Sequence, residues 1–140
     1  TARTWSRVGN VGLPMLPGRM GVARTPVTSL LIDSGKLFAG TEHGVFYVAE
    51  NATGDGGWTG ISKGLVELHV TSLTTDAKGN LIAGTLNGAF TVASSSADPT
   101  WSAYSDTRGE VIASVVKVGN EVVVATRKQP GKSSRTFIGD

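Results

Sequence analysis

An internal repeat constrains the fold of this chain more than any other feature of its sequence. The segment 27–49 aligns with the segment 70–93 when one gap is allowed, and 14 of the 23 aligned positions are identical. A third copy, IASVVKVGNEVVVATRK, begins at Ile112. The three copies begin at Val27, Val70 and Ile112, which are 43 and 42 residues apart. Such a period indicates that one structural unit is stacked several times along the chain.

Each copy predicts short strands joined by tight turns. The first strand, VTSLLID in the first copy, is rich in β-branched residues and ends at the turn DSGK. The corresponding turns are DAKGN and VGNE, whose Asp, Asn and Gly residues suit hairpins. The second strands, LFAGT, LIAGT and VVVAT, carry a Gly or Ala that leaves room for a close neighbour. No window has an apolar period of 3.6 residues that is long enough for a helix, so we expect an all-β fold.

The period and the strand pattern predict a β-propeller, because its four-stranded blades take roughly 40–45 residues. We expect a Trp strand at 1–9, a long loop at 10–26, blades at 27–62 and 70–105, and a partial blade at 112–140. The N-terminal strand would complete the partial blade, which gives three four-stranded blades with a permuted, shared-blade closure. Propellers typically have four to eight blades. We therefore expect either six blades in a homodimer or one part of a longer propeller.

The repeats resemble those of two-component-regulator (sensor-type) propellers and of Asp-box propellers of the sialidase-like and xyloglucan-hydrolase-like kinds. The Asp box is roughly Ser-x-Asp-x-Gly-x-x-Trp. SSADPTW, which contains Asp98 and ends at Trp101, is a shortened version, as is TGDGGW, which contains Asp55 and ends at Trp58. The resemblance implies that these boxes are structural and lie on the face away from the ligand. The recurrence of Trp5, Trp58 and Trp101 at one position per repeat favours packing between blades over sugar binding.

Candidate ligand-binding residues follow from the loops that ring one mouth of a propeller channel. These loops join second to third strands and each blade to the next. The third-copy loop, RKQPGKSSR, is longer than its equivalents, and loops that depart from a repeat often carry function. The polar and charged residues that we place on this rim are Glu42, His43, Glu67, His69, Asn87, Arg108, Arg127 and Lys128.

These residues favour a non-catalytic ligand-binding or scaffold module, of which a sensor-like module is one form. We expect its ligand to be a carbohydrate or another small molecule. The alternative is a carbohydrate-active enzyme, a glycoside hydrolase, in which Glu42, Glu67 and Glu110 could supply an acid/base pair. That chemistry needs two carboxyls about 5–10 Å apart, which a sequence cannot place. No catalytic residue is assigned. The spacing of the two histidines and their neighbouring glutamates fits no usual metal site, so we expect no metal and no cofactor.

The bulk composition excludes several classes of partner. The formal net charge is +2, and no basic run is interleaved with aromatic residues, so nucleic-acid binding is not expected. No apolar run approaches 18 residues, so we expect no membrane span. The chain has no cysteine, which excludes disulfides and thiolate metal sites. The compartment stays open, with a periplasmic or secreted location favoured.

Overall fold

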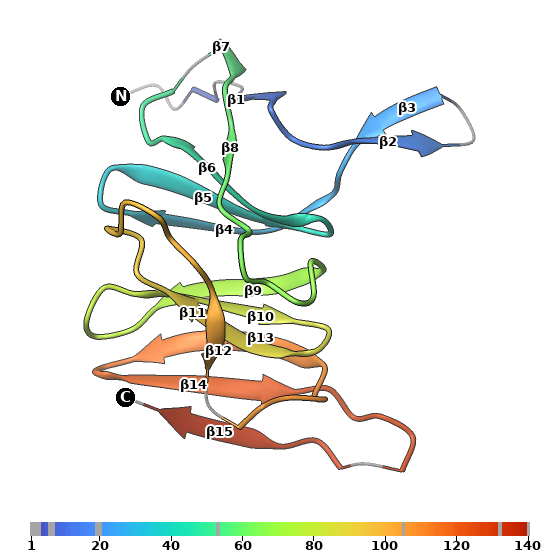
Figure 1. The fold of residues 1–140 in the computed structure, drawn as a ribbon, viewed down its shortest axis with the longest axis vertical. Helices are drawn as coiled ribbons and strands as arrows, with labels where there is room; N and C mark the ends of the chain where they lie inside the picture. Colours follow the sequence, from blue (N-terminus) through green and yellow to red (C-terminus); the bar gives the residue numbers. More distant parts are fainter. Residues whose placement is uncertain are drawn as a thin grey trace.

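The prediction of an all-β fold is confirmed. The computed structural model describes residues 4–5, 8–18, 21–52, 54–104, 106–131 and 133–139, and every regular element in this part of the chain is a β-strand. Two pairs of strands and three larger antiparallel sheets form the molecule (Figure 1). Nothing in the described residues is a helix long and apolar enough to cross a membrane.

The three larger sheets correspond to the three copies of the repeat. The first sheet has the order β4 (Val27–Asp33), β5 (Lys36–Thr41), β6 (Gly44–Ala49) and β8 (Thr59–Gly60). The second sheet has the order β9 (Val70–Thr75), β10 (Leu81–Thr85), β11 (Gly88–Val92) and β12 (Ser102–Tyr104). The third sheet has three strands, β13 (Ile112–Val118), β14 (Glu121–Thr126) and β15 (Thr136–Gly139).

All three sheets have the same register, including the same bulge near the start of the first strand. Val27 pairs with Thr41, Val70 with Thr85 and Ile112 with Thr126. In each sheet one residue is then skipped before pairing resumes, and the skipped residues are Thr28, Thr71 and Ala113. A bulge leaves such a residue outside the ladder and turns its side chain away from the sheet. The repeat in the sequence is therefore a repeat of backbone geometry.

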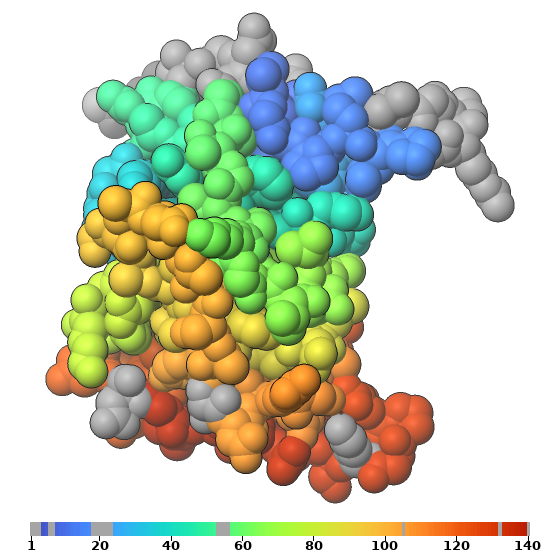
Figure 2. All heavy atoms as spheres, viewed as in Figure 1, coloured from blue at the N-terminus to red at the C-terminus, as the bar shows by residue number. Residues whose placement is uncertain are grey.

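The sheets are stacked in sequence order (Figures 1 and 2). The hydrophobic core lies between them. We call the contact of the first and second sheets the first junction, and that of the second and third sheets the second junction. The first strands meet there, because β4 packs beside β9 and β9 beside β13. The first junction contains Phe38, Leu81, Phe90 and Trp101, and the second contains Ile82, Ile112, Val122 and Val124.

Hydroxyl groups of the VTS sequence link the sheets at both junctions. The Thr28 hydroxyl donates to the Val70 carbonyl over 2.6 Å, and the Thr71 hydroxyl donates to the Ile112 carbonyl over 2.7 Å. The bulge makes this possible, since it leaves the Thr residue outside the ladder of its own sheet. Each such bond contributes about 1 kcal/mol to stability.

Small residues in the second strands allow the sheets to approach closely. A Cβ atom at Gly40 would lie 2.6 Å from Val70 Cγ1, and one at Gly84 would lie 2.5 Å from Ile112 Cγ2. Both contacts are shorter than real Cβ atoms tolerate. The glycines of the two AGT sequences therefore admit the first residue of the next sheet, as the sequence indicated.

The N-terminal region differs from the expected long loop at 10–26. β1 (Val8–Val11) pairs in parallel with β7 (Gly54–Gly56), and β2 (Met15–Gly18) forms an antiparallel hairpin with β3 (Gly21–Arg24). Backbone pairing in this hairpin runs from Met15 to Gly18 and includes Pro17. A proline is tolerated there because β2 has only one neighbouring strand. The Arg24 side chain donates to the Leu13 carbonyl over 2.7 Å, which anchors its base.

The described residues do not form a closed propeller ring. Residues 1–3 and 6–7 of the expected Trp strand lie outside the described residues. β15 pairs only with β14 in the part of the chain that the structure describes, so the third sheet has three strands. Closure by an N-terminal strand stays a prediction.

Candidate functional site

The turns that join second to third strands lie at one edge of the stack, on the right in Figure 1. Their backbones are anchored in the same way. The amide of Glu42 donates to Pro26 over 3.2 Å, that of Leu86 to His69 over 3.2 Å, and that of Arg127 to Val111 over 2.8 Å. Each acceptor is the carbonyl just before the first strand of the same sheet. The rim residues that we predicted on these three turns therefore start from equivalent backbone positions.

A threonine at the end of each second strand shapes the turn that follows. The hydroxyls of Thr41 and Thr85 donate to the carbonyls of Gly44 and Gly88, over 2.9 and 2.7 Å. In the third sheet the Thr126 hydroxyl donates to the Arg135 carbonyl over 3.1 Å and accepts from the Arg135 amide over 2.7 Å. The long third loop is thus inserted between positions that are neighbours in the other two sheets.

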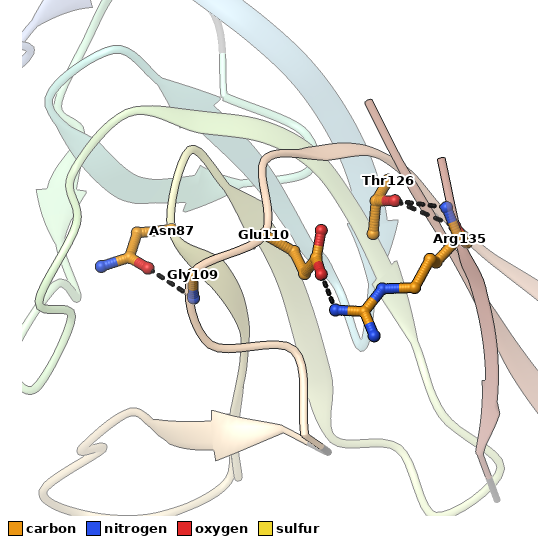
Figure 3. A network of polar contacts seen from close by, with 5 residues as sticks. All are labelled: Asn87, Gly109, Glu110, Thr126 and Arg135. Carbon is orange, nitrogen blue, oxygen red and sulfur yellow. Dashed lines mark hydrogen bonds and ion pairs between the residues drawn. The ribbon is translucent and has the colours of Figure 1, made fainter. Parts of the chain in front are cut away.

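Asn87 and Arg108, two of the predicted ligand residues, line one hollow at this edge. The hollow has a volume of about 360 Å³. The Asn87 Oδ1 accepts a hydrogen bond of 2.8 Å from the Gly109 amide, which fixes the orientation of the side chain (Figure 3). Its NH₂ group points away from Gly109. The remaining wall is mostly apolar and comprises Gly64, Val66, Gly88, Ala89, Phe90, Ala103 and Thr107.

The other predicted ligand residues do not line this hollow. His43 Nδ1 lies 2.8 Å from the Thr25 hydroxyl, and Glu67 Oε1 accepts from the His69 amide over 2.9 Å. Both contacts organise the loops themselves. Lys128 lines a separate, open hollow of about 520 Å³ with residues 129–131 and 133 of the long loop. Glu42, His69 and Arg127 line neither hollow. A single site that unites all eight residues stays a prediction.

A polar network connects the loops of the second and third sheets (Figure 3). Glu110 is buried, and its Oε1 forms an ion pair with Arg135, whose guanidinium is half exposed. Its Oε2 has no hydrogen-bond partner in the described residues. The Arg135 guanidinium also lies 5.4 Å from the Phe137 ring centre. Arg135 therefore fastens the long loop to the connection that carries Arg108. We did not predict this role, since Arg135 lies in the long loop, which has no equivalent in the other two repeats.

The Trp residues of the repeats pack against the connection that leaves the preceding unit. The Trp58 indole donates to the Gly9 carbonyl over 2.8 Å, and the Trp101 indole donates to the Ile61 carbonyl. Trp101 is buried and Trp58 is half-buried, which suits a structural role. Trp5 is fully exposed in the described part of the chain.

The shortened Asp box before Trp101 makes a surface contact. Asp98 pairs with Lys63 over 2.7 Å, and its amide donates to the Ser96 hydroxyl over 3.3 Å. Both charged groups are largely exposed, so the pair contributes little stability. The side chain of Asp55, in the other box, lies outside the described residues.

No group of three or more potential metal-ligating side chains is found in the described residues. The arrangement at the hollow offers a cation, an amide and an apolar wall, which suits binding. Comparisons of the chain with protein-family models, with curated proteins and with solved structures return no match.

Proposed function

We propose that the three sheets are blades of a β-propeller of the ligand-binding, sensor-like kind. The shared register and bulge of the sheets support this interpretation, as do the two junctions formed by their first strands. The ring would be completed to six blades by a second copy, or to another number by further blades of a longer chain. The strand that completes the third blade would lie beside β15.

We propose that the hollow at Asn87 and Arg108 binds a small ligand that carries both an anionic group and an apolar face. The observation that carries this proposal is that Arg108 and the oriented amide of Asn87 line one hollow together with Phe90. A guanidinium recognises carboxylates strongly, and an oriented amide adds a directional hydrogen bond. A sugar acid fits this chemistry, because it presents a carboxylate, hydroxyls and an apolar ring face.

Binding is favoured over catalysis by the residues that line the hollows. No Asp or Glu is among the described residues lining the hollow of Asn87, the hollow of Lys128 or a third one near Tyr47. Glycoside hydrolysis needs two carboxyls that face one substrate. Glu110, which we considered as an acid or base, is buried and paired with Arg135. The glycoside hydrolase alternative therefore has less support than the binding module.

Glucuronate and glucose form a matched pair of probes, since they differ in the carboxylate that Arg108 would bind. We expect glucuronate to shift the backbone amide signals of residues 87–89 and 108–109 in an NMR titration, and glucose to shift them far less. Arg108→Gln should abolish the difference between the two sugars. Lys128→Gln, which removes a cation from the other hollow, is the matched control and should leave it unchanged. Equal responses to both sugars, or shifts confined to the long loop, would show that the site is misplaced.

A further inference from the structure

Among the residues that the structure describes, the first and third sheets each leave one face open. These two faces are equivalent to the two faces that meet at each junction inside the chain. We propose that the open face of the third sheet in one copy packs against the open face of the first sheet in a second copy. This proposal rests on the blade interpretation given above, but it does not depend on the ligand.

The open face of the first sheet carries the apolar residues that a preceding sheet covers elsewhere. Val27 is 45% exposed, whereas its equivalent Val70 is 0% exposed. Leu30 is 62% exposed, whereas its equivalent Leu73 is 7% exposed. The register of the strands makes these pairs equivalent, so the difference comes from the missing neighbour. Covering such side chains is favourable by roughly 25 cal/mol for each Å² of apolar surface.

The open face of the third sheet carries a serine equivalent to those that hydrogen-bond to the following sheet at the two junctions. The Ser29 hydroxyl accepts from the Leu73 amide over 3.1 Å, and the Ser72 hydroxyl accepts from the Val115 amide over 3.1 Å. The equivalent residue in the third sheet is Ser114, which is exposed. By the same geometry, its hydroxyl would accept from the Leu30 amide of the second copy.

Apolar residues flank Ser114 on this face. Val116 is 48% exposed, and its equivalent in the first sheet is Leu31, which packs against the core of the first junction. Val118 is exposed as well. An apolar surface with a central hydroxyl therefore faces outward, and an apolar surface with a matching backbone amide lies on the other end of the same chain.

Two positions make the junction between copies looser than those within the chain. Ala113 stands where Thr28 and Thr71 donate to the next sheet, so one hydrogen bond is missing. Ala125 stands where Gly40 and Gly84 admit the next sheet closely. The methyl group of Ala125 would keep the second copy's Val27 at a greater distance. We therefore expect association to be reversible.

Restoring these two residues should strengthen the association. Ala113→Thr supplies the hydroxyl that would donate to the second copy's Val27 carbonyl, and Ala125→Gly removes the obstructing methyl group. The double variant should dimerise about twofold to tenfold more tightly per junction, which is the expected effect of one added hydrogen bond. The change in the dimer dissociation constant is measured by isothermal dilution calorimetry or by analytical ultracentrifugation. An unchanged or weaker association of a folded double variant would contradict the proposed register.

Disulfide trapping tests the contact directly, because the chain has no cysteine of its own. One chain carries Ser114→Cys and the other carries Leu30→Cys. After the two are mixed and oxidised, we expect a cross-linked species of twice 14.5 kDa, and little from either variant alone. The double variant Ser29→Cys/Leu73→Cys is the internal control, because it places the same pair at the first junction. Closure of the control disulfide without cross-linking in the mixture would overturn the proposal.

Discussion

The second sheet and the first sheet share most of their sequence, yet their apolar residues lie in different surroundings. The second sheet is covered on both faces, by Phe38 of the first sheet on one side and by Ile112 of the third on the other. In the described part of the chain the first sheet is covered on one face only, so Leu30 is exposed where its equivalent Leu73 is buried. Burial in this repeat therefore depends on the neighbouring sheet rather than on the residue itself.

Substitution of the tryptophans should give the largest difference in the free energy of unfolding between buried and exposed positions. Trp101 is 3% exposed and donates its indole N–H to Ile61. Trp101→Ala should therefore lower the free energy of unfolding by about 3–5 kcal/mol, which is usual for a buried Trp. Urea denaturation followed by circular dichroism measures this value.

Trp5 provides the matched control, because it is fully exposed. Trp5→Ala should leave the free energy of unfolding of the monomer unchanged within about 0.5 kcal/mol. Equal losses in the two variants would show that burial in the repeat does not control stability.

A second difference concerns two glycines with positive φ, one in the connection between two sheets and one in a hairpin turn within a sheet. Gly64 has a φ of +91°, and a Cβ atom there would lie 2.4 Å from the Trp101 carbonyl oxygen. Gly119 has a φ of +62° in an open turn with no atom near its Cβ position. Gly64→Ala should cost about 2–3 kcal/mol, because it adds a backbone clash to the strain of the left-handed conformation, and Gly119→Ala about 1 kcal/mol. Thermal denaturation of both variants compares them, and a larger loss at Gly119 would contradict the proposed packing.

A third difference concerns the hydrogen bonds accepted by the equivalent residues Asp76 and Asp33, which lie at the turns after the first strands. Burial raises the pKa of Asp76, but hydrogen bonds from the Asn80 side chain and from the Asn80 and Lys78 amides outweigh it and lower that pKa below 3.8. The equivalent Asp33 accepts a hydrogen bond from Ser34. Asp76→Ala should cost about 2 kcal/mol at neutral pH, and Asp33→Ala much less.

The effect of Asp76 should depend on pH with a definite sign. A carboxyl whose pKa is lowered by folding stabilises the folded state above the unfolded pKa of 3.8, and this stabilisation is lost as the pH falls through the folded pKa. The difference between the wild type and Asp76→Ala should therefore shrink as the pH falls below 3.8. Urea denaturation between neutral and acidic pH tests this, and a difference that grows towards acid would contradict the assignment.

The smallest expected effect is the difference in monomer stability between the variants Ser72→Ala and Ser114→Ala. The Ser72 hydroxyl accepts from the Val115 amide at the second junction, so Ser72→Ala should lower the stability of the monomer by about 1 kcal/mol. Ser114→Ala removes an exposed hydroxyl and should leave the monomer unchanged while weakening its association. Measurements of unfolding and of dimerisation on both variants distinguish the two roles. Equal loss of monomer stability would place Ser114 inside the chain's own core.

Most of the sheet structure follows from the repeat, because β-branched strands, tight turns and small residues recur with a fixed period. The close approach at Gly40, for example, is predictable from the AGT sequence alone. The hairpin β2–β3 is not, since Pro17 and the flanking glycines indicate a loop and only the backbone pairing reveals two strands.

The candidate site was less predictable than the fold. Asn87 and Arg108 could be placed at one edge by counting turns, but their hollow also needs Val66 from the preceding connection. The pairing of Glu110 with Arg135 depends on a long loop that has no equivalent in the other repeats. Residues outside a repeat carry no periodic signal, so only the three-dimensional structure brings them together.

Sedimentation equilibrium of the unmodified chain tests most directly whether the two open faces meet. If the open face of the third sheet packs against that of the first sheet in a second copy, the mass should rise with concentration from 14.5 kDa towards twice that value. The Ala113→Thr/Ala125→Gly variant should reach the dimer at lower concentration. A mass that stays at 14.5 kDa for both chains over the whole concentration range would contradict the account.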